Sequence, residues 1–161
     1  MHYRGDRLTI RHFKNGDEQK CESLLMDSFS WYLKLEGSEW ILSKLSSESI
    51  LSQSREGLTL VAEEDGLIVG FVHMSTMDYG VGYISVIGVS PQSQGKNIGA
   101  KLLKRIEREG RNKKLRKIWL MVSHSNTGAI NFYLRNGYSV DGVIRDFTLE
   151  GLHEMIMSKH L

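Results

Sequence analysis

A strand, a turn and an amphipathic helix follow one another in the middle of the chain, and this succession restricts the fold more than any other feature. "VGYISVIGV" (Val81–Val89) is typical of a β-branched strand, and it ends at Ser90-Pro91, which holds the only proline. From Ile98 onwards apolar residues recur at every fourth position, and lysine and arginine cover much of the remaining surface. Because such a helix must bury its apolar face, the stretch predicts a helix packed on a sheet.

Further strands and helices are predicted on both sides of this unit. Asp65-Gly66 separates two strand-like runs and predicts a hairpin, because type I′ turns need positive φ. Asp17 and Asn126 are expected to cap the helices that follow them, and Asn136-Gly137 to end the second of these. The predicted strands are 8–13, the two halves of 58–77, 117–122 and two tail segments joined around Glu150-Gly151; the further predicted helices are 17–29, 38–54 and 126–136. This order predicts an α/β (α+β) fold, a mixed sheet flanked by helices.

Length and composition fit one globular domain. The chain has 161 residues, of which 40% are hydrophobic and 25% are charged, and we expect a single domain over 1–161. A net charge of +2 is too small to indicate nucleic acid as a direct ligand. No set of His, Asp and Glu residues has the spacing of metal ligands, so no metal is expected.

The expected location is the cytoplasm, and no membrane partner is expected. Cys21 is the single cysteine, which excludes an intrachain disulfide and fits a reducing compartment. The longest apolar runs are only as long as strands, and the polar start "MHYRGDRLTIRHF" lacks the apolar core of a secretory signal.

The turn after Val89 has the chemistry of a phosphate site. Its glycines let a ligand approach the backbone, and the first amides of the following helix have no acceptor within the helix. The Walker pattern fails because Ser90 replaces its first glycine and Asn97 its Ser/Thr, and no G-x-G-x-x-G follows a strand here. The sequence therefore argues against a nucleoside triphosphate or a dinucleotide at this turn.

The same turn resembles the acyl-CoA signature of the GNAT N-acetyltransferases, Q/R-x-x-G-x-G/A. Gln94 to Gly99 match it in order, except that Asn97 replaces the first of its glycines; asparagine tolerates left-handed backbone better than most residues. "SNTGAINFYLRNGY" is similar to the family's second signature. The matching residues there are Asn126, Ala129, Phe132, Tyr133, Asn136, Gly137 and Tyr138. The order of elements is also similar to that of the family, so the resemblance covers essentially the whole chain, and the strand around Tyr83 resembles that of ribosomal-protein-alanine and other N-terminal acetyltransferases.

The resemblance implies acetyl-CoA as cosubstrate and a mostly antiparallel sheet of about seven strands, with the fourth and fifth splayed apart. The pantetheine arm would bond to the backbone of Ile87, Gly88 and Val89 and contact Asn126. The pyrophosphate would be held by backbone amides of Gln94, Gly95, Lys96, Asn97, Ile98, Gly99 and Ala100. Tyr133 would be the general acid for the leaving thiolate; its alternative role is that of a half-buried helix tyrosine.

The sequence does not identify the general base. Many family members carry a glutamate on the fourth strand, but Val81–Val89 contains no carboxylate. Tyr83 is the candidate for a proton relay through water, or else a core aromatic. Met121 fills the position at which some related enzymes have a histidine, and His124 is a weak substitute.

The acceptor is predicted to be an amine, with a protein or peptide N-terminus favoured. An α-amine with a pKa of about 7.8 is roughly one-seventh neutral at pH 7, whereas a lysine near 10.4 is neutral only about four times in ten thousand. An enzyme without a strong base suits the α-amine better. Phe29, Trp31, Tyr32 and His73 are candidates for the acceptor wall, with ordinary packing as the alternative. Three alternatives stay open: a small-molecule amine acceptor, a non-catalytic acyl-CoA-binding module and a basic surface adaptor that binds nucleic acid independently of CoA. A homodimer is a further open prediction.

Overall fold

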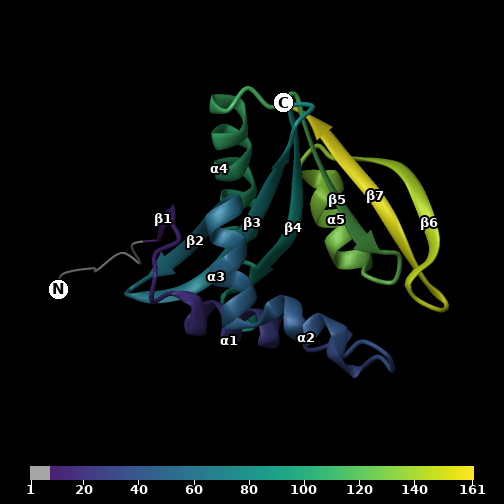
Figure 1. Cartoon of the computed structure of the whole chain (residues 1–161), viewed down its shortest axis with the longest axis horizontal. Helices are drawn as coiled ribbons and strands as arrows, with labels where there is room; N and C mark the ends of the chain where they lie inside the picture. The colour runs from purple at the N-terminus through teal and green to yellow at the C-terminus, as the bar shows by residue number, and fades with distance from the viewer. Residues whose placement is uncertain (1–7) are drawn as a thin grey trace. The chain divides into compact units, whose positions relative to one another are not determined.

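The computed structural model describes residues 8–161 (Figure 1). The chain divides into two compact units. The N-terminal unit contains the described residues up to Met74 together with Val86–Ile106, and the C-terminal unit contains Ser75–Ser85 and Glu107–Leu161. The single domain over 1–161 stays a prediction. The first seven residues of the polar start, on which the expected location partly rests, lie outside the described residues.

Seven strands form one sheet in the order β1-β2-β3-β4-β5-β7-β6. The sheet is mostly antiparallel, and only the pairing of β4 (Val81–Val89) with β5 (Lys117–Ser123) is described as parallel. This pairing joins Val81–Ile84 to Lys117–Leu120, although both strands continue beyond it. The mixed sheet is confirmed, and the pairing ends where the expected splay would begin.

In the N-terminal unit, β1 (Thr9–His12), β2 (Leu58–Glu64) and β3 (Leu67–Met77) pair antiparallel. The turn between β2 and β3 has φ of 50° at Asp65 and 82° at Gly66. Positive φ at both central residues is what a type I′ turn requires. The hairpin predicted from this dipeptide is therefore confirmed.

The helices of this unit differ from the prediction in one place. α1 (Glu18–Ser28) and the 3₁₀ turn η1 (Tyr32–Lys34) are followed by two short helices, α2 (Trp40–Leu45) and α3 (Ser47–Glu56). The single helix predicted over 38–54 is wrong, because Ser46 has ψ of 152° and its hydroxyl accepts a hydrogen bond from Ser49 N at 3.2 Å. Ser46 is thus an N-cap, which starts a new helix.

Asp17 also behaves differently from the expectation. It precedes α1, but its side chain makes no cap hydrogen bond. Instead its carboxylate lies 2.7 Å from Nη1 of Arg11 and accepts from Lys14 N at 2.9 Å. The Asp17 carboxylate therefore pairs with Arg11 of β1 and does not cap α1.

Two faces of β2 and β3 are covered within this unit. Val61 and Phe71 belong to a buried cluster with Cys21 and Leu25 of α1. On the opposite face, a Cβ added to Gly70 would lie 2.8 Å from Leu102 and 3.1 Å from Ile98, both on α4 (Ile98–Asn112). The missing side chain of Gly70 therefore lets α4 approach the sheet, as the amphipathic pattern predicted.

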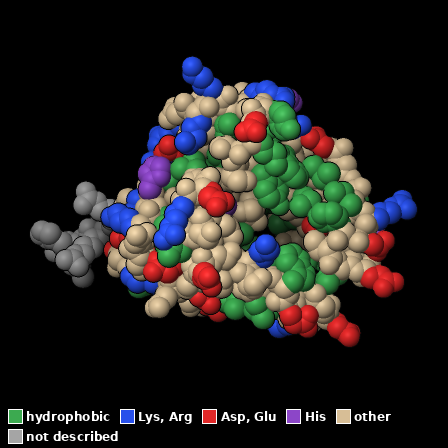
Figure 2. Space-filling model, in the orientation of Figure 1, with side chains coloured by type: hydrophobic (Ala, Val, Ile, Leu, Met, Phe, Trp, Pro, Cys, Tyr) green, Lys and Arg blue, Asp and Glu red, His purple; other side chains and the backbone are tan. Residues whose placement is uncertain are grey.

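The C-terminal unit is built on β5, α5 (Thr127–Arg135), β6 (Ser139–Leu149) and β7 (Leu152–His160). Figure 1 shows β6 and β7 as a long hairpin in yellow-green and yellow, and residues 154–160 of β7 pair antiparallel with the whole of β5. Hydrophobic side chains gather over α5 and β7 on the face that Figure 2 shows. The two tail strands are confirmed.

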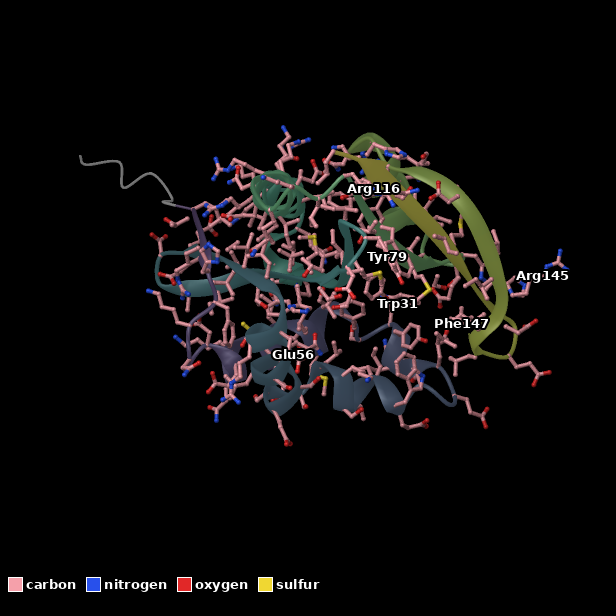
Figure 3. The ribbon with its side chains drawn as sticks, turned by 45° about the horizontal axis from the view of Figure 1, so that its top comes forward. Trp31, Glu56, Tyr79, Arg116, Arg145 and Phe147 are labelled. Atoms are coloured by element: carbon pink, nitrogen blue, oxygen red, sulfur yellow. The ribbon has the colours of Figure 1, made fainter. Side chains whose placement is uncertain are left out.

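Arg116 fixes the start of β5 against the turn before β4. Its backbone amide donates to Gly80 O at 2.8 Å, and its Nε donates to Tyr79 O at 3.2 Å (Figure 3). These bonds hold the parallel pair together at the end where it is registered. None of the helices in the described part of the chain is both long and apolar enough to span a membrane.

Candidate functional site

The glycine turn, Ser90–Asn97, connects β4 to α4. It begins with a short 3₁₀ segment, η2 (Pro91–Ser93), and then passes through two left-handed residues, Gly95 at φ 80° and Asn97 at φ 60°. Left-handed backbone is costly for most side chains and least so for glycine and asparagine. The expectation that Asn97 can take this conformation in place of glycine is confirmed.

The amides at the end of this turn and at the start of α4 are available to a ligand. Within residues 8–161, the backbone N–H groups from Gly95 to Ala100 donate no hydrogen bond to the chain, and the first such bond is from Lys101 N to Asn97 O. α4 is fifteen residues long, so its dipole adds partial positive charge at this end. Gln94–Asn97 are exposed, and the arrangement is chemically suited to an anion such as a pyrophosphate.

The end of β4 is packed against α1. Gly88 is buried beside Leu25 and Ser28, while Ile87 and Val89 are half-buried. Val89 O accepts from Ser28 Oγ and from Gln94 Nε2, each at 3.3 Å. The side chain of Gln94 thus ties the glycine turn to the strand that precedes it.

Lys96 reaches away from the turn toward β2. Its Nζ lies 3.3 Å from Oε2 of Glu64, and half of the lysine side chain is exposed. An exposed pair of this kind contributes little to stability. The lysine therefore remains able to turn toward an anion.

Asn126 and Tyr133 lie at the start and near the end of α5. The side-chain oxygen of Asn126 accepts from Ala129 N at 3.1 Å, so the predicted cap is confirmed. Tyr133 is buried, with its ring centroid 5.2 Å from that of Phe132 and 5.7 Å from that of Tyr138. Burial raises the pKa of Tyr133, and the nearby Tyr83 adds to this effect.

Tyr83 lies on β4 with its ring against Trp119 of β5, the centroids being 4.4 Å apart. Burial raises the pKa of its phenol, and the carboxylate of Glu154 raises it further. Tyr83 therefore lies within electrostatic range of both Tyr133 and the carboxylate of Glu154. Both phenols stay protonated at neutral pH.

Glu154 was not a candidate from the sequence. It lies near the start of β7, is only 6% exposed and sits opposite Ser123 in the pairing of β5 with β7. A carboxylate inside the apolar strand "LHEMIM" was the only signal that could have indicated it. An acidic side chain is rarely this buried without a partner or a role.

The four candidates for an acceptor wall all lie in the N-terminal unit. The Trp31 and Tyr32 rings are 5.4 Å apart in an edge-on contact, and Phe29 packs against the buried cluster around α1. Figure 3 shows Trp31 among the side chains of this region. Of these residues, Trp31 and Phe29 are half-buried and Tyr32 is buried.

His73 is the most enclosed of these candidates. It is 3% exposed on β3, and its Nδ1 is 2.8 Å from Thr59 Oγ1. Burial lowers the pKa of His73 to about 4. This placement favours the packing role over contact with an acceptor.

Among residues 8–161, no three His, Cys, Asp or Glu side chains are grouped so that they could hold a metal ion.

A model of the GNAT acetyltransferase family matches residues 19–138. An uncharacterized N-acetyltransferase of Methanocaldococcus jannaschii is 35% identical over 100 residues, which are 62% of this chain and 64% of that relative. The chain matches still smaller shares of the other curated relatives, so it spans less than two thirds of their lengths.

Solved structures resemble the whole fold. The PaiA N-acetyltransferase of Thermoplasma acidophilum, in complex with coenzyme A, superposes with a TM-score of 0.84 at 23% identity, covering 96% of this chain and 99% of that one. The ribosomal-protein-S18-alanine N-acetyltransferase of Escherichia coli gives 0.79 at 19% identity, covering 96% and 94%. At these identities the likeness shows the fold, and the family model shows the relationship: the chain belongs to the GNAT acetyltransferase family.

Proposed function

We propose that this protein is an acetyl-CoA-dependent N-acetyltransferase that transfers an acetyl group to a primary amine by direct attack. The observation that carries the proposal is the glycine turn, where left-handed Gly95 and Asn97 belong to a run of six residues, 95–100, whose amides have no partner in residues 8–161. Such amides at a helix N-terminus stabilise a pyrophosphate. Membership of the GNAT family supports the same ligand.

Acetyl-CoA, when bound, supplies the thioester that carries the acetyl group. The amides from Gln94 to Ala100 hold its pyrophosphate, and the backbone of Ile87–Val89 pairs with the pantetheine arm. Asn126 keeps its Nδ2 for that arm, because its Oδ1 caps α5. Backbone N–H groups near Gly88 and Val89 polarise the thioester carbonyl, as an oxyanion hole does.

Tyr133 donates a proton to the leaving thiolate. Its raised pKa keeps the phenol protonated at neutral pH, which a proton donor needs. Tyr83 lies close enough to affect that pKa, and it relays a proton from the amine through water.

The favoured acceptor is the α-amine of a protein or peptide. At pH 7 an α-amine is neutral roughly several hundred times more often than a lysine, because its pKa is lower. Less free energy is therefore needed to deprotonate it, which supports this choice. Likeness in fold to an S18-alanine N-acetyltransferase is compatible with it. Trp31, Tyr32 and Phe29 form the acceptor wall in this proposal, whereas His73, the fourth candidate, has a packing role.

We place the protein in the cytoplasm, because its single cysteine, the buried Cys21, suits a reducing compartment. A homodimer stays a prediction, which sedimentation at several protein concentrations tests.

The test is acetyl-CoA turnover on matched acceptors. One peptide has a free N-terminus and no lysine, a second has the same sequence with a blocked N-terminus, and a third has a blocked N-terminus and one lysine. A panel of polyamines, aminoglycosides and amino-acid derivatives completes the set. We expect product from the first peptide.

Product from small amines alone would overturn the choice of acceptor while keeping the reaction. Acetyl-CoA binding with no product from any acceptor would overturn the enzyme and leave an acyl-CoA-binding module. If acetyl-CoA does not bind, the assignment of the glycine turn as its pyrophosphate site is wrong.

A further inference from the structure

The buried carboxylate of Glu154 has no explanation in the proposed mechanism so far. It lies on β7 opposite Ser123, at the end of β5 that follows the registered part of the β4–β5 pair. Residues directly opposite one another in adjacent strands point to the same face of a sheet, and every second residue along a strand returns to that face.

That rule places Glu154 and Tyr83 on one face. Tyr83 is registered with Trp119, and the positions of β5 that share the face of Trp119 are Met121 and Ser123. Glu154 is the partner of Ser123. The carboxylate and the phenol therefore face the same side of the sheet, and the influence of Glu154 on the pKa of Tyr83 agrees with this.

One oxygen of this carboxylate is already bound. Thr148 Oγ1 on β6 donates to Glu154 Oε1 at 2.9 Å, whereas no hydrogen bond within residues 8–161 involves Oε2. The hydroxyl fixes the carboxylate in one orientation and leaves the second oxygen for a water molecule or a ligand. This is the arrangement that a proton acceptor requires.

The surroundings of the carboxylate make it a stronger base than an exposed glutamate. Burial raises its pKa, while the Thr148 hydrogen bond and the nearby His124 oppose the rise. The titratable groups around it are Tyr83 on β4, His124 after β5 and His153, which precedes Glu154 on β7 and whose ring stacks on His124 at 4.9 Å.

We propose that Glu154 accepts, through water and Tyr83, the proton that the acceptor ammonium loses before attack. This inference rests on the proposed acetyltransferase function. At pH 7 about six-sevenths of an α-amine is protonated, so even a weak base near the site increases the share of bound amine that can attack.

The proton balance of the reaction closes with these groups. Glu154 takes one proton from the ammonium and returns it to the solvent after each turnover. The amine nitrogen then forms a bond to the acetyl carbonyl carbon, the carbon–sulfur bond breaks, and Tyr133 gives the thiolate a proton. The second proton lost by nitrogen restores the phenol through water.

The first experiment compares wild type, Glu154→Gln and Glu150→Gln with acetyl-CoA and the free N-terminal peptide between pH 6 and 9. Glu150 lies exposed in the turn that joins β6 to β7, so its replacement is a matched control. We expect Glu154→Gln to lower kcat at pH 7 by about 100-fold, with the remaining rate rising as the amine loses its own proton. Glu150→Gln keeps the wild-type profile.

A second arm separates proton transfer from structural support. Glu154→Ala is assayed with and without formate, a small carboxylate that can occupy the vacated space, and thermal melting checks that the variants fold. A rate that is at least tenfold higher with formate than without it supports Glu154 as the proton acceptor. A loss that is equal at every pH, with no effect of formate, overturns it.

The two proposals fail in different ways. An active wild type with a fully active Glu154→Gln variant overturns only the inference on Glu154. An inactive wild type that still binds acetyl-CoA overturns the proposed enzyme and the inference with it. If His124→Gln loses the pH-dependent step while Glu154→Gln keeps it, His124 is the proton acceptor. That result also overturns the inference on Glu154.

Discussion

Tyr133 is buried, and it lies on α5, the helix that Asn126 caps. A hydroxyl in such a place can be removed without changing the shape of the side chain, because phenylalanine fills the same volume. The contribution of the phenol hydroxyl to the reaction can therefore be measured separately from the packing of the ring.

Tyr133→Phe is therefore expected to lower kcat by about 100-fold or more, because the leaving thiolate loses its proton donor. The affinity for coenzyme A stays within about twofold. Steady-state kinetics and titration calorimetry measure the two quantities. Tyr79→Phe, an equivalent change at a residue that is 77% exposed, is the control and keeps full activity. Unchanged turnover in Tyr133→Phe would remove the acid role.

Asn97 is the residue at which the chain departs from the family pattern, and its φ of 60° explains why the departure is tolerated. Asn97→Gly is expected to keep coenzyme A affinity. Asn97→Val forces a β-branched side chain into left-handed backbone, at a cost of about 1–2 kcal/mol. We expect this variant to bind coenzyme A several-fold more weakly in calorimetry. Equal binding by the valine variant would show that the left-handed residue does not shape the site.

At the scale of elements, the break between α2 and α3 depends on one hydroxyl. Ser46→Ala is expected to lower the free energy of unfolding by about 1 kcal/mol, because Ser49 N loses its cap. Urea denaturation measures the change. Ser52→Ala, in the exposed middle of α3, is the control and is expected to be neutral or slightly stabilising. A neutral Ser46→Ala would mean that packing alone starts α3.

The elements also show which features a sequence can predict. Asp65-Gly66, Asn97 and the Asn126 cap were predicted because each depends on the backbone preference of one or two residues. The break at Ser46 was missed because no glycine or proline marks it, and a serine cap is a weak signal in a stretch that is rich in serine.

Glu154 was missed for a different reason. Its burial follows from the pairing of β7 with β5, two strands separated in the chain by α5 and β6, and from Thr148 on β6. Register between distant strands is not encoded in a local pattern, since a shift by one residue turns every side chain to the other face. The opposite case is Tyr133, which the second motif indicates without any information on burial.

For the whole molecule, His73 links stability to pH. Its pKa is about 4 in the folded state because of burial, against about 6.5 when unfolded. Between these values the unfolded chain binds more protons than the folded one, so stability falls as the pH is lowered. The loss attributable to this group is about 2 kcal/mol at pH 5 and about 3 kcal/mol below pH 4.

His73→Gln removes this titration while keeping a polar partner for Thr59, 2.8 Å from the imidazole in the native chain. We expect the variant to be less stable than wild type at pH 7.5, because the side chain packs less well, and to lose less stability than wild type on going to pH 5. Urea denaturation at both pH values measures the two slopes, and all other titrating groups are common to the pair. Parallel slopes would mean that His73 becomes protonated without unfolding, and hence that β3 opens locally to water at this position.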